Sequence, residues 1–506
     1  MLSITMKESL FHVKMLASDE FQGREAGTAG QWLAAKYIAN EFAKYGLLPV
    51  GDNHTYYQHF KIVRSDLRQA ELTVWTQKKH GYQETKYAVQ TDFIPLSFTG
   101  ENALNAPVVF AGYGISAPEY GYDDYQGIDV MDKIVLVLRH EPQENYVKSP
   151  FAGLELTRHA QLSVKAQNAR AHGAVGLLVV SDPASGHSNL APQGFWPAFF
   201  PDNKYPETWR LVATDRAEDF PALWIDNEIA NKLLRPQRYS LVKLQESIDT
   251  FLQPVSFEIK GVRLSVKVTL RKDLRKTQNV LGLLPGSDAL LKHQLVVVGA
   301  HYDHLGIKKG KIYPGADDNA SGTAGLLEIA EAFSETPVLP RRSILFAAFS
   351  AEELGLLGSE YYVLNPVRPL KQSVSMLNLD MISRNADNQV SIIGGNRSPE
   401  LQAINEAANR KIGLELLYNG EKYFSRSDQA SFAKHKVPVL FYNTDTHDDY
   451  HQPSDLAEKI NPEKLARIAR LAFLVAWEVV NADVAPTVQR VEVSEKSDRL
   501  RSVVVR

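Results

Sequence analysis

Four mostly apolar runs decide the fold class of this 506-residue chain. They read QLVVVGA at 294–300, SILFAAF at 343–349, VSMLNLDMI at 374–382 and VPVLFYN at 437–443. Runs of this kind are typical of strands that are covered on both faces of a sheet. Segments with helical periodicity separate or follow them, at 320–333, 354–364, 399–412 and 462–480. Strands that alternate with helices predict an α/β fold, with a mixed, largely parallel sheet flanked by helices.

The middle of the chain has a different pattern. Between residues 105 and 252, short apolar runs lie among loops rich in Gly and Pro, and GAVGLLVV at 173–180 follows a helix-like segment. This indicates a β-rich insert. We therefore expect four parts, which are 1–104 and 253–483 for the main domain, 105–252 for the insert, and 484–506 for a polar tail.

Composition excludes several classes of protein. The chain has no cysteine, so disulfides, zinc–thiolate sites and cysteine nucleophiles are excluded. Lys and Arg number 56 against 59 Asp and Glu, a net charge of −3, which gives no electrostatic reason to bind nucleic acid. No stretch approaches the ~20 apolar residues that cross a bilayer. The first residues, MLSITMKESL, lack the pattern of an export signal. The compartment is therefore left open: the protein is expected to be exported, either periplasmic or secreted, if a signal peptide was removed, and cytoplasmic otherwise.

Charged side chains gather where the four apolar runs end. His301 follows the first run, Glu352–Glu353 follow the second, Asp380 follows the third, and a loop with His451 follows the fourth. A further acidic pair, Asp317–Asp318, comes just before a helix. Because the carboxyl ends of parallel strands meet at one edge of a sheet, we expect these side chains to lie close together.

These residue types suit a metal centre. Zinc binds imidazole nitrogen and carboxylate oxygen, and a catalytic zinc keeps one position open for water. Five such ligands can serve two ions only if one carboxylate is shared, and two ions ~3.5–4 Å apart can hold a hydrolytic water. Each cluster alone has a simpler interpretation, since an Asp pair can cap a helix and a Glu pair can favour its first turn. Asp380, within an apolar run, needs a buried partner in any case.

Several motifs together resemble the M28 family of co-catalytic zinc exopeptidases. They are HYDHLG at 301–306, GADDNASG at 315–322, FSAEELGLLGSEYY at 349–362, LNLDM at 377–381 and DYHQPSD at 449–455. FQGREAGTAG at 21–30 is similar to the opening segment of these peptidases. The insert resembles a protease-associated (PA) domain through VVFAGYGI, DKIVLVLR and KAQNARAHGAVGLLVVSD, at 108–115, 132–139 and 165–182.

The resemblance implies the zinc exopeptidase fold and a ligand set for two zinc ions per chain. His301 would bind one ion and His451 the other. Asp317, the first of the Asp pair, would bridge both ions. Glu353 and Asp380 would complete the two sets of ligands.

The resemblance also implies catalytic roles. Glu352 would be the general base, Asp303 would hold the imidazole of His301, and Tyr450 would stabilise the oxyanion. Asp455 could hold His451 in the same way or cap a loop. In the segment SRSDQASF, at 425–432, Arg426 or Asp428 could contact the substrate, although Ser-Asp can equally begin a helix.

The predicted activity is that of an aminopeptidase, which removes N-terminal residues from peptides. A carboxypeptidase or dipeptidase on the same two-zinc site is the alternative, because Arg426 would suit a free α-carboxylate. Glutaminyl cyclisation is a third alternative. It typically works with one zinc ion, so the complete set of five ligands argues against it. The alternative outside the enzymes is a non-catalytic binding protein that uses the PA-like insert as its interaction surface. Peptides are the expected partners, and the oligomeric state is left open.

Overall fold

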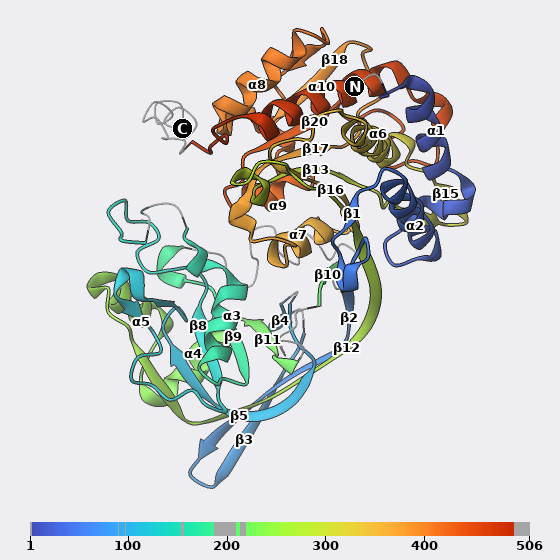
Figure 1. The fold of residues 1–506 in the computed structure, drawn as a ribbon. Coiled ribbons are helices and arrows are strands. Elements are labelled where there is room, and N and C mark those ends of the chain that lie inside the picture. Colours follow the sequence, from blue (N-terminus) through green and yellow to red (C-terminus); the bar gives the residue numbers. More distant parts are fainter. Residues whose placement is uncertain are drawn as a thin grey trace, which may run out of the picture. The chain divides into compact units, whose positions relative to one another are not determined.

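The structure is a computed structural model that describes residues 3–89, 91–96, 98–151, 153, 156–186, 209–212 and 219–489 (Figure 1). The chain forms two compact units. Unit 1 comprises Met1–Val63, Trp209–Val212 and Leu274–Arg506, and unit 2 comprises Arg64–Thr208 and Ala213–Asp273. The expected insert at 105–252 is therefore only part of unit 2, to which 64–104 and 253–273 also belong. From residue 490 onward, the expected tail lies outside the described residues.

Unit 1 is built on a mixed, largely parallel sheet. Its strand order is β19-β18-β20-β17-β13-β16, followed by the end of β12. β13 is parallel to both β16 and β17, and β17 is parallel to β20, whereas β12 and β18 pair antiparallel with their neighbours β16 and β20. The strands are β12 (Ser256–Leu284), β13 (Leu295–His301), β16 (Ser343–Phe349), β17 (Ser373–Leu379), β18 (Gln389–Ile393), β19 (Glu415–Leu417) and β20 (Val439–Asn443).

Helices cover both faces of this sheet, which explains why its central strands are apolar at nearly every position. In β13, Val296 and Val298 belong to one hydrophobic cluster and Leu295 and Val297 belong to another. Side chains of the first cluster come from α1 (Met6–Leu16), α2 (Ala29–Lys44), α6 (Gly322–Ser334), α8 (Pro399–Asn409) and α10 (Pro462–Asn481). Those of the second come from α7 (Leu357–Leu364) and α9 (Gln429–Ala433) (Figure 1).

Unit 2 contains the strands β5, β8, β9, β11 and β4, together with an N-terminal hairpin. Strands β5, β8, β9 and β11 are parallel, and β4 and the first part of β12 pair antiparallel at the two sides of this group. The elements are β2 (Tyr57–Lys78), β3 (Gly81–Tyr87), β4 (Phe93–Pro95), β5 (Asn102–Ala111), β8 (Ile134–Leu138), α3 (Leu162–Ala171), β9 (Gly176–Val180), β11 (Ala222–Ile225), α4 (Asn227–Leu234) and α5 (Leu241–Phe251).

Short strands complete the chain. β1 (Leu48–Pro49) pairs with β12, β6 (Ser116–Ala117) with β7 (Tyr122–Asp123), β10 (Trp209–Leu211) with β2, and β14 (Gly306–Lys308) with β15 (Lys311–Tyr313). Among the described residues, no helix has the length and apolar character that a bilayer span requires.

A buried arginine fixes the loop that leads from β13 to the acidic pair. Arg24, in the N-terminal motif, is 1% exposed. Its guanidinium donates hydrogen bonds to the carbonyl oxygens of Tyr302 at 2.8 Å, Pro314 at 2.7 Å and Gly315 at 2.9 Å. Burial lowers the pKa of Arg24 to about 10, which leaves it charged at neutral pH. The N-terminal segment thus holds both ends of this loop in place.

Candidate metal centre

The strands of unit 1 bring the predicted side chains to one edge of the sheet. His301 is the last residue of β13, and Asp380 comes directly after β17. Glu352–Glu353 follow β16, and His451 lies in the loop after β20. All four strands run parallel, so their carboxyl ends carry these residues to the same place.

The first histidine faces two carboxylates. Nε2 of His301 lies 3.4 Å from Oδ1 of Asp318 and 3.3 Å from Oδ1 of Asp380. All three side chains are buried. Oδ1 of Asp380 has no hydrogen-bond partner among the described residues. His301, Asp318 and Asp380 therefore form one compact group of metal-binding atoms.

The second histidine faces the other side of the same aspartate. Nε2 of His451 lies 3.1 Å from Oδ2 of Asp318 and 3.1 Å from Oε2 of Glu353. His451 is more accessible than its two partners, with 35% of its side chain exposed against 4% and 6%. Asp318 thus turns one oxygen toward each histidine.

This arrangement corrects the expectation for Asp317. The shared carboxylate belongs to Asp318, while Oδ1 of Asp317 accepts hydrogen bonds from the backbone N–H of Ser383 at 3.0 Å and its hydroxyl at 2.7 Å. Oδ2 of Asp317 lies 3.2 Å from Nε2 of His447. The physical reason is the backbone: the pair lies in an irregular loop ahead of α6, where Asp318 has φ −105° and ψ 94°. Adjacent side chains in such a loop point to different partners.

The donor spacing fits zinc. Nitrogen and oxygen ligands lie about 2.0–2.2 Å from the ion, so two ligands at a tetrahedral angle are roughly 3.3 Å apart. The four histidine–carboxylate distances of 3.1–3.4 Å agree with that spacing. Charge-assisted N–H···O hydrogen bonds are typically shorter, about 2.7–2.9 Å, and the 3.1 Å pairs of His451 also lie within hydrogen-bonding distance.

The electrostatics of the group also favour cations. Burial lowers the pKa of His301, but Glu352, Asp380 and Asp318 raise it, and it ends well above its ordinary value. The pKa of His451 rises to about 10, because hydrogen bonds to Asp318 and Glu353 outweigh burial. Each histidine is thus surrounded by more carboxylates than imidazoles. Buried charges of this kind must be paired or must bind a metal.

Glu352 lies beside the two groups without belonging to either. Its Oε2 is 3.9 Å from Nε2 of His301, farther than any of the paired carboxylates. Burial raises its pKa well above the ordinary value; His301 opposes that shift, and Glu353 adds to it. A carboxylate that is close to the metal-binding atoms but separate from them can act as a proton acceptor.

Asp303 contacts both His301 and Glu352, but its contact with His301 differs from the expected one. Its Oδ1 accepts the backbone N–H of Glu352 at 3.1 Å and so positions that residue. Nδ1 of His301 lies 3.3 Å from the backbone oxygen of Asp303 but 3.9 Å from its carboxylate. The carbonyl is therefore the nearer partner of the imidazole. Burial raises the pKa of Asp303 to about 8.

Tyr450 and Arg426 line a small cavity beside Asp380. The ring of Tyr450 stacks on His451, with 3.9 Å between centroids. The cavity, of about 40 Å³, is bounded by both residues and by Asp380 and Tyr423. Asp428 does not line it and is fully buried. Of the two residues expected to contact the substrate, Arg426 therefore lines this cavity and Asp428 does not.

His304 has a role that sequence reasoning missed. Its Nδ1 lies 2.6 Å from Oε1 of Glu353, a hydrogen bond that orients the carboxylate. Asp455 takes the second of its two expected roles: its carboxylate does not hold the His451 imidazole but caps a loop, by accepting the backbone N–H groups of Asp317 and Asp318. The HYDH motif places His304 near the site, but nothing in the sequence identifies its partner.

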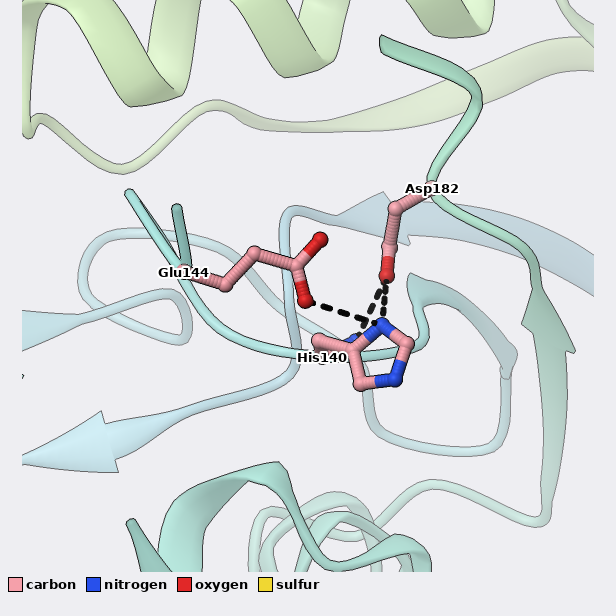
Figure 2. A group of neighbouring side chains, drawn as sticks. All are labelled: His140, Glu144 and Asp182. Atoms are coloured by element: carbon pink, nitrogen blue, oxygen red, sulfur yellow. Dashed lines mark hydrogen bonds and ion pairs between the residues drawn. The ribbon is translucent and has the colours of Figure 1, made fainter. Parts of the chain in front are cut away.

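Unit 2 contains another group of potential metal ligands, His140, Glu144 and Asp182 (Figure 2). His140 and Asp182 each follow one of two paired parallel strands, β8 and β9, which brings them together. Nδ1 of His140 is 2.5 Å from Asp182 and 3.3 Å from Glu144. Asp182 also accepts the N–H groups of Arg139 and His140. The short contact is a hydrogen bond, so this group joins two strand ends and differs from the centre in unit 1.

Two parts of the chain match known protein families. Residues 279–476 match peptidase family M28, and residues 104–233 match the PA domain. Aminopeptidase YwaD of Bacillus subtilis is 30% identical over 233 residues, which are 44% of this chain and 49% of that protein. A probable leucine aminopeptidase of Trichophyton verrucosum is 29% identical over 226 residues, 43% of this chain and 61% of its own. The chain thus spans about half the length of the first relative and 61% of the second.

A solved structure described as a zinc aminopeptidase from Bacillus subtilis is also similar. It has 22% identity and a TM-score of 0.47, and the similarity covers 95% of this chain and 97% of that one.

The fold and the donor set define an α/β protein with a metal-binding edge. The part of the chain at 279–476 thus matches peptidase family M28, and the part at 104–233 matches the PA domain.

Proposed function

We propose that this protein is a zinc-dependent aminopeptidase that hydrolyses N-terminal residues from peptides with two zinc ions. One observation carries the proposal: two histidines each face two carboxylates, and Asp318 is common to both groups. The similarity to aminopeptidases over the M28 segment supports the direction of cleavage.

Five side chains would hold the two ions. His301 and Asp380 would serve one ion, His451 and Glu353 would serve the other, and Asp318 would serve both. When bound, zinc lowers the pKa of water toward neutrality and polarises a peptide carbonyl.

The chain's own residues complete the reaction. Glu352 accepts a proton from the attacking water and delivers it to the leaving amine as the C–N bond breaks. The backbone contact with Asp303 keeps Glu352 beside His301. The hydroxyl of Tyr450 would donate a hydrogen bond to the developing oxyanion, since its ring is held against His451. Water thus adds across the peptide bond.

A carboxypeptidase is the second candidate, and one observation favours it. Arg426 lines the cavity next to Asp380, where its guanidinium could pair with a free α-carboxylate. Acidic side chains at the same edge would instead suit a free α-amine.

Peptides with blocked ends distinguish the two candidates. We expect zinc-loaded protein to remove N-terminal residues from a short peptide, and chelation or N-terminal acetylation to abolish the release. Amidation of the C-terminus should leave the rate unchanged. Mass spectrometry of the digestion products measures each case.

Two outcomes of the same assay would contradict the proposed aminopeptidase. Cleavage that survives acetylation but stops on C-terminal amidation would replace the aminopeptidase with a carboxypeptidase. Absence of cleavage in every peptide, with zinc bound, would refute peptide hydrolysis for this substrate set.

A further inference from the structure

Asp455 accepts hydrogen bonds from three successive backbone N–H groups of the loop that carries Asp318. Its carboxylate oxygens accept the N–H of Asp317 at 3.1 and 3.0 Å, and Oδ2 also accepts the N–H of Asp318 at 3.1 Å. Its backbone oxygen accepts the N–H of Ala316 at 3.2 Å. Asp455 itself is fully buried.

The same residue belongs to the segment that carries the second histidine. His451 precedes Asp455 by four positions, and the N–H of Asp455 donates to the carbonyl of Gln452 at 3.2 Å. The two loops that meet at Asp455 thus carry Nε2 of His451 and Oδ2 of Asp318, which lie 3.1 Å apart. A shift of either loop would change that distance.

A carboxylate is well suited to this position. Two N–H groups point at it from one irregular loop, and an ionised carboxylate accepts both without offering a donor of its own. An asparagine would turn an NH₂ group toward one of the amides. Arg384, whose Nη1 is 3.9 Å from Oδ1, supplies a nearby positive charge.

We propose that Asp455 is a positioning residue that sets the distance between His451 and Asp318 and thereby the affinity for zinc. The inference rests on the proposed function, because it assumes that these two side chains bind one ion. Asp455 touches neither the substrate nor the ion in this account. It acts through the backbone of the loop before α6.

The test compares Asp455→Asn with Asp449→Asn. Asp449 lies in the same loop and pairs with the same Arg384 at 2.9 Å, but its carboxylate accepts its other hydrogen bonds from Ser454 and Lys459 and none from the loop of Asp317 and Asp318. Zinc dissociation constants are measured on metal-free protein by competition with a chelator. Loss of residues that support metal ligands typically costs 10–100-fold in affinity. We expect a rise of about 10- to 100-fold in Asp455→Asn and no change in Asp449→Asn.

A spectroscopic readout separates positioning from general stability. The visible absorption of the cobalt-loaded protein reports ligand geometry, and it should change in Asp455→Asn but not in Asp449→Asn. Thermal unfolding of the metal-free proteins shows whether each variant folds. If Asp455→Asn does not fold, Asp455→Ser serves instead, because its hydroxyl accepts fewer amides and leaves room for water.

Wild-type zinc affinity and cobalt spectrum in a folded Asp455 variant would overturn the inference and leave the proposed function intact. A wild-type protein that binds no zinc would instead contradict the proposed function, and the same titration reveals this before any variant is compared.

Discussion

Replacing Glu352 with glutamine is expected to lower kcat by about 10²- to 10⁴-fold while the zinc content stays unchanged. The amide keeps the shape of the side chain but cannot accept the proton of the attacking water. Zinc should remain because Glu352 lies 3.9 Å from His301, outside the 3.1–3.4 Å spacing of the ligand pairs. Steady-state kinetics and elemental analysis of the same preparation measure both quantities.

The matched control is Glu360→Gln. Glu360 is exposed on α7 and lies close in sequence to Glu352. Its substitution should change neither turnover nor metal content. A near-normal rate in Glu352→Gln would show that another group accepts the proton, and loss of zinc would show that Glu352 is itself a ligand.

Replacing Asp318 with asparagine should weaken zinc binding, whereas the same substitution at the neighbouring Asp317 should not. Asp318→Asn replaces one of the two oxygens that face His301 and His451 with an NH₂ group, which does not bind zinc. We expect zinc affinity to fall by more than about 100-fold, because removal of supporting residues alone already costs 10–100-fold. Hydrolysis should fall with it.

Asp317→Asn should retain zinc, since an amide oxygen can still accept the two hydrogen bonds from Ser383. Zinc binding to the metal-free variants, followed by calorimetry, compares the pair directly. The reverse result, with zinc lost in Asp317→Asn and kept in Asp318→Asn, would restore the assignment that the sequence motif alone implied.

The sheet could be predicted because its strands are buried on both faces. The run at 343–349 coincides with β16, and that at 294–300 differs from β13 by one residue at each end. The start of the next helix was harder to predict. It was expected at residue 354, but α7 begins only at Leu357, so the acidic pair Glu352–Glu353 lies in the loop before it. Continuous apolar runs locate strands well, whereas helix starts depend on local capping.

The five candidate metal ligands could be predicted to within one residue. Strand ends placed His301, Glu353, Asp380 and His451 together, because parallel strands share an edge. The choice between Asp317 and Asp318 depended on the backbone of a loop, which no periodicity describes. The contacts of His304 and Asp455 join segments 49 and more than 130 residues apart, so no local pattern reveals them.

The division of the chain shows the same limit. The apolar runs of the insert were visible, and DKIVLVLR at 132–139 and GAVGLLVV at 173–180 contain β8 and β9. The boundaries between the two units could not be predicted, because β2 and β12 are long strands that each contain such a boundary. A uniform strand pattern gives no signal at such a point.

The two-zinc mechanism can be tested by titrating the metal-free protein with zinc and following the hydrolysis of a peptide with a free N-terminus at each step. We expect activity to be absent without metal, to rise with added zinc and to reach its plateau at two equivalents per chain. Activity in fully chelated protein, or two bound zinc ions without any hydrolysis, would contradict that mechanism.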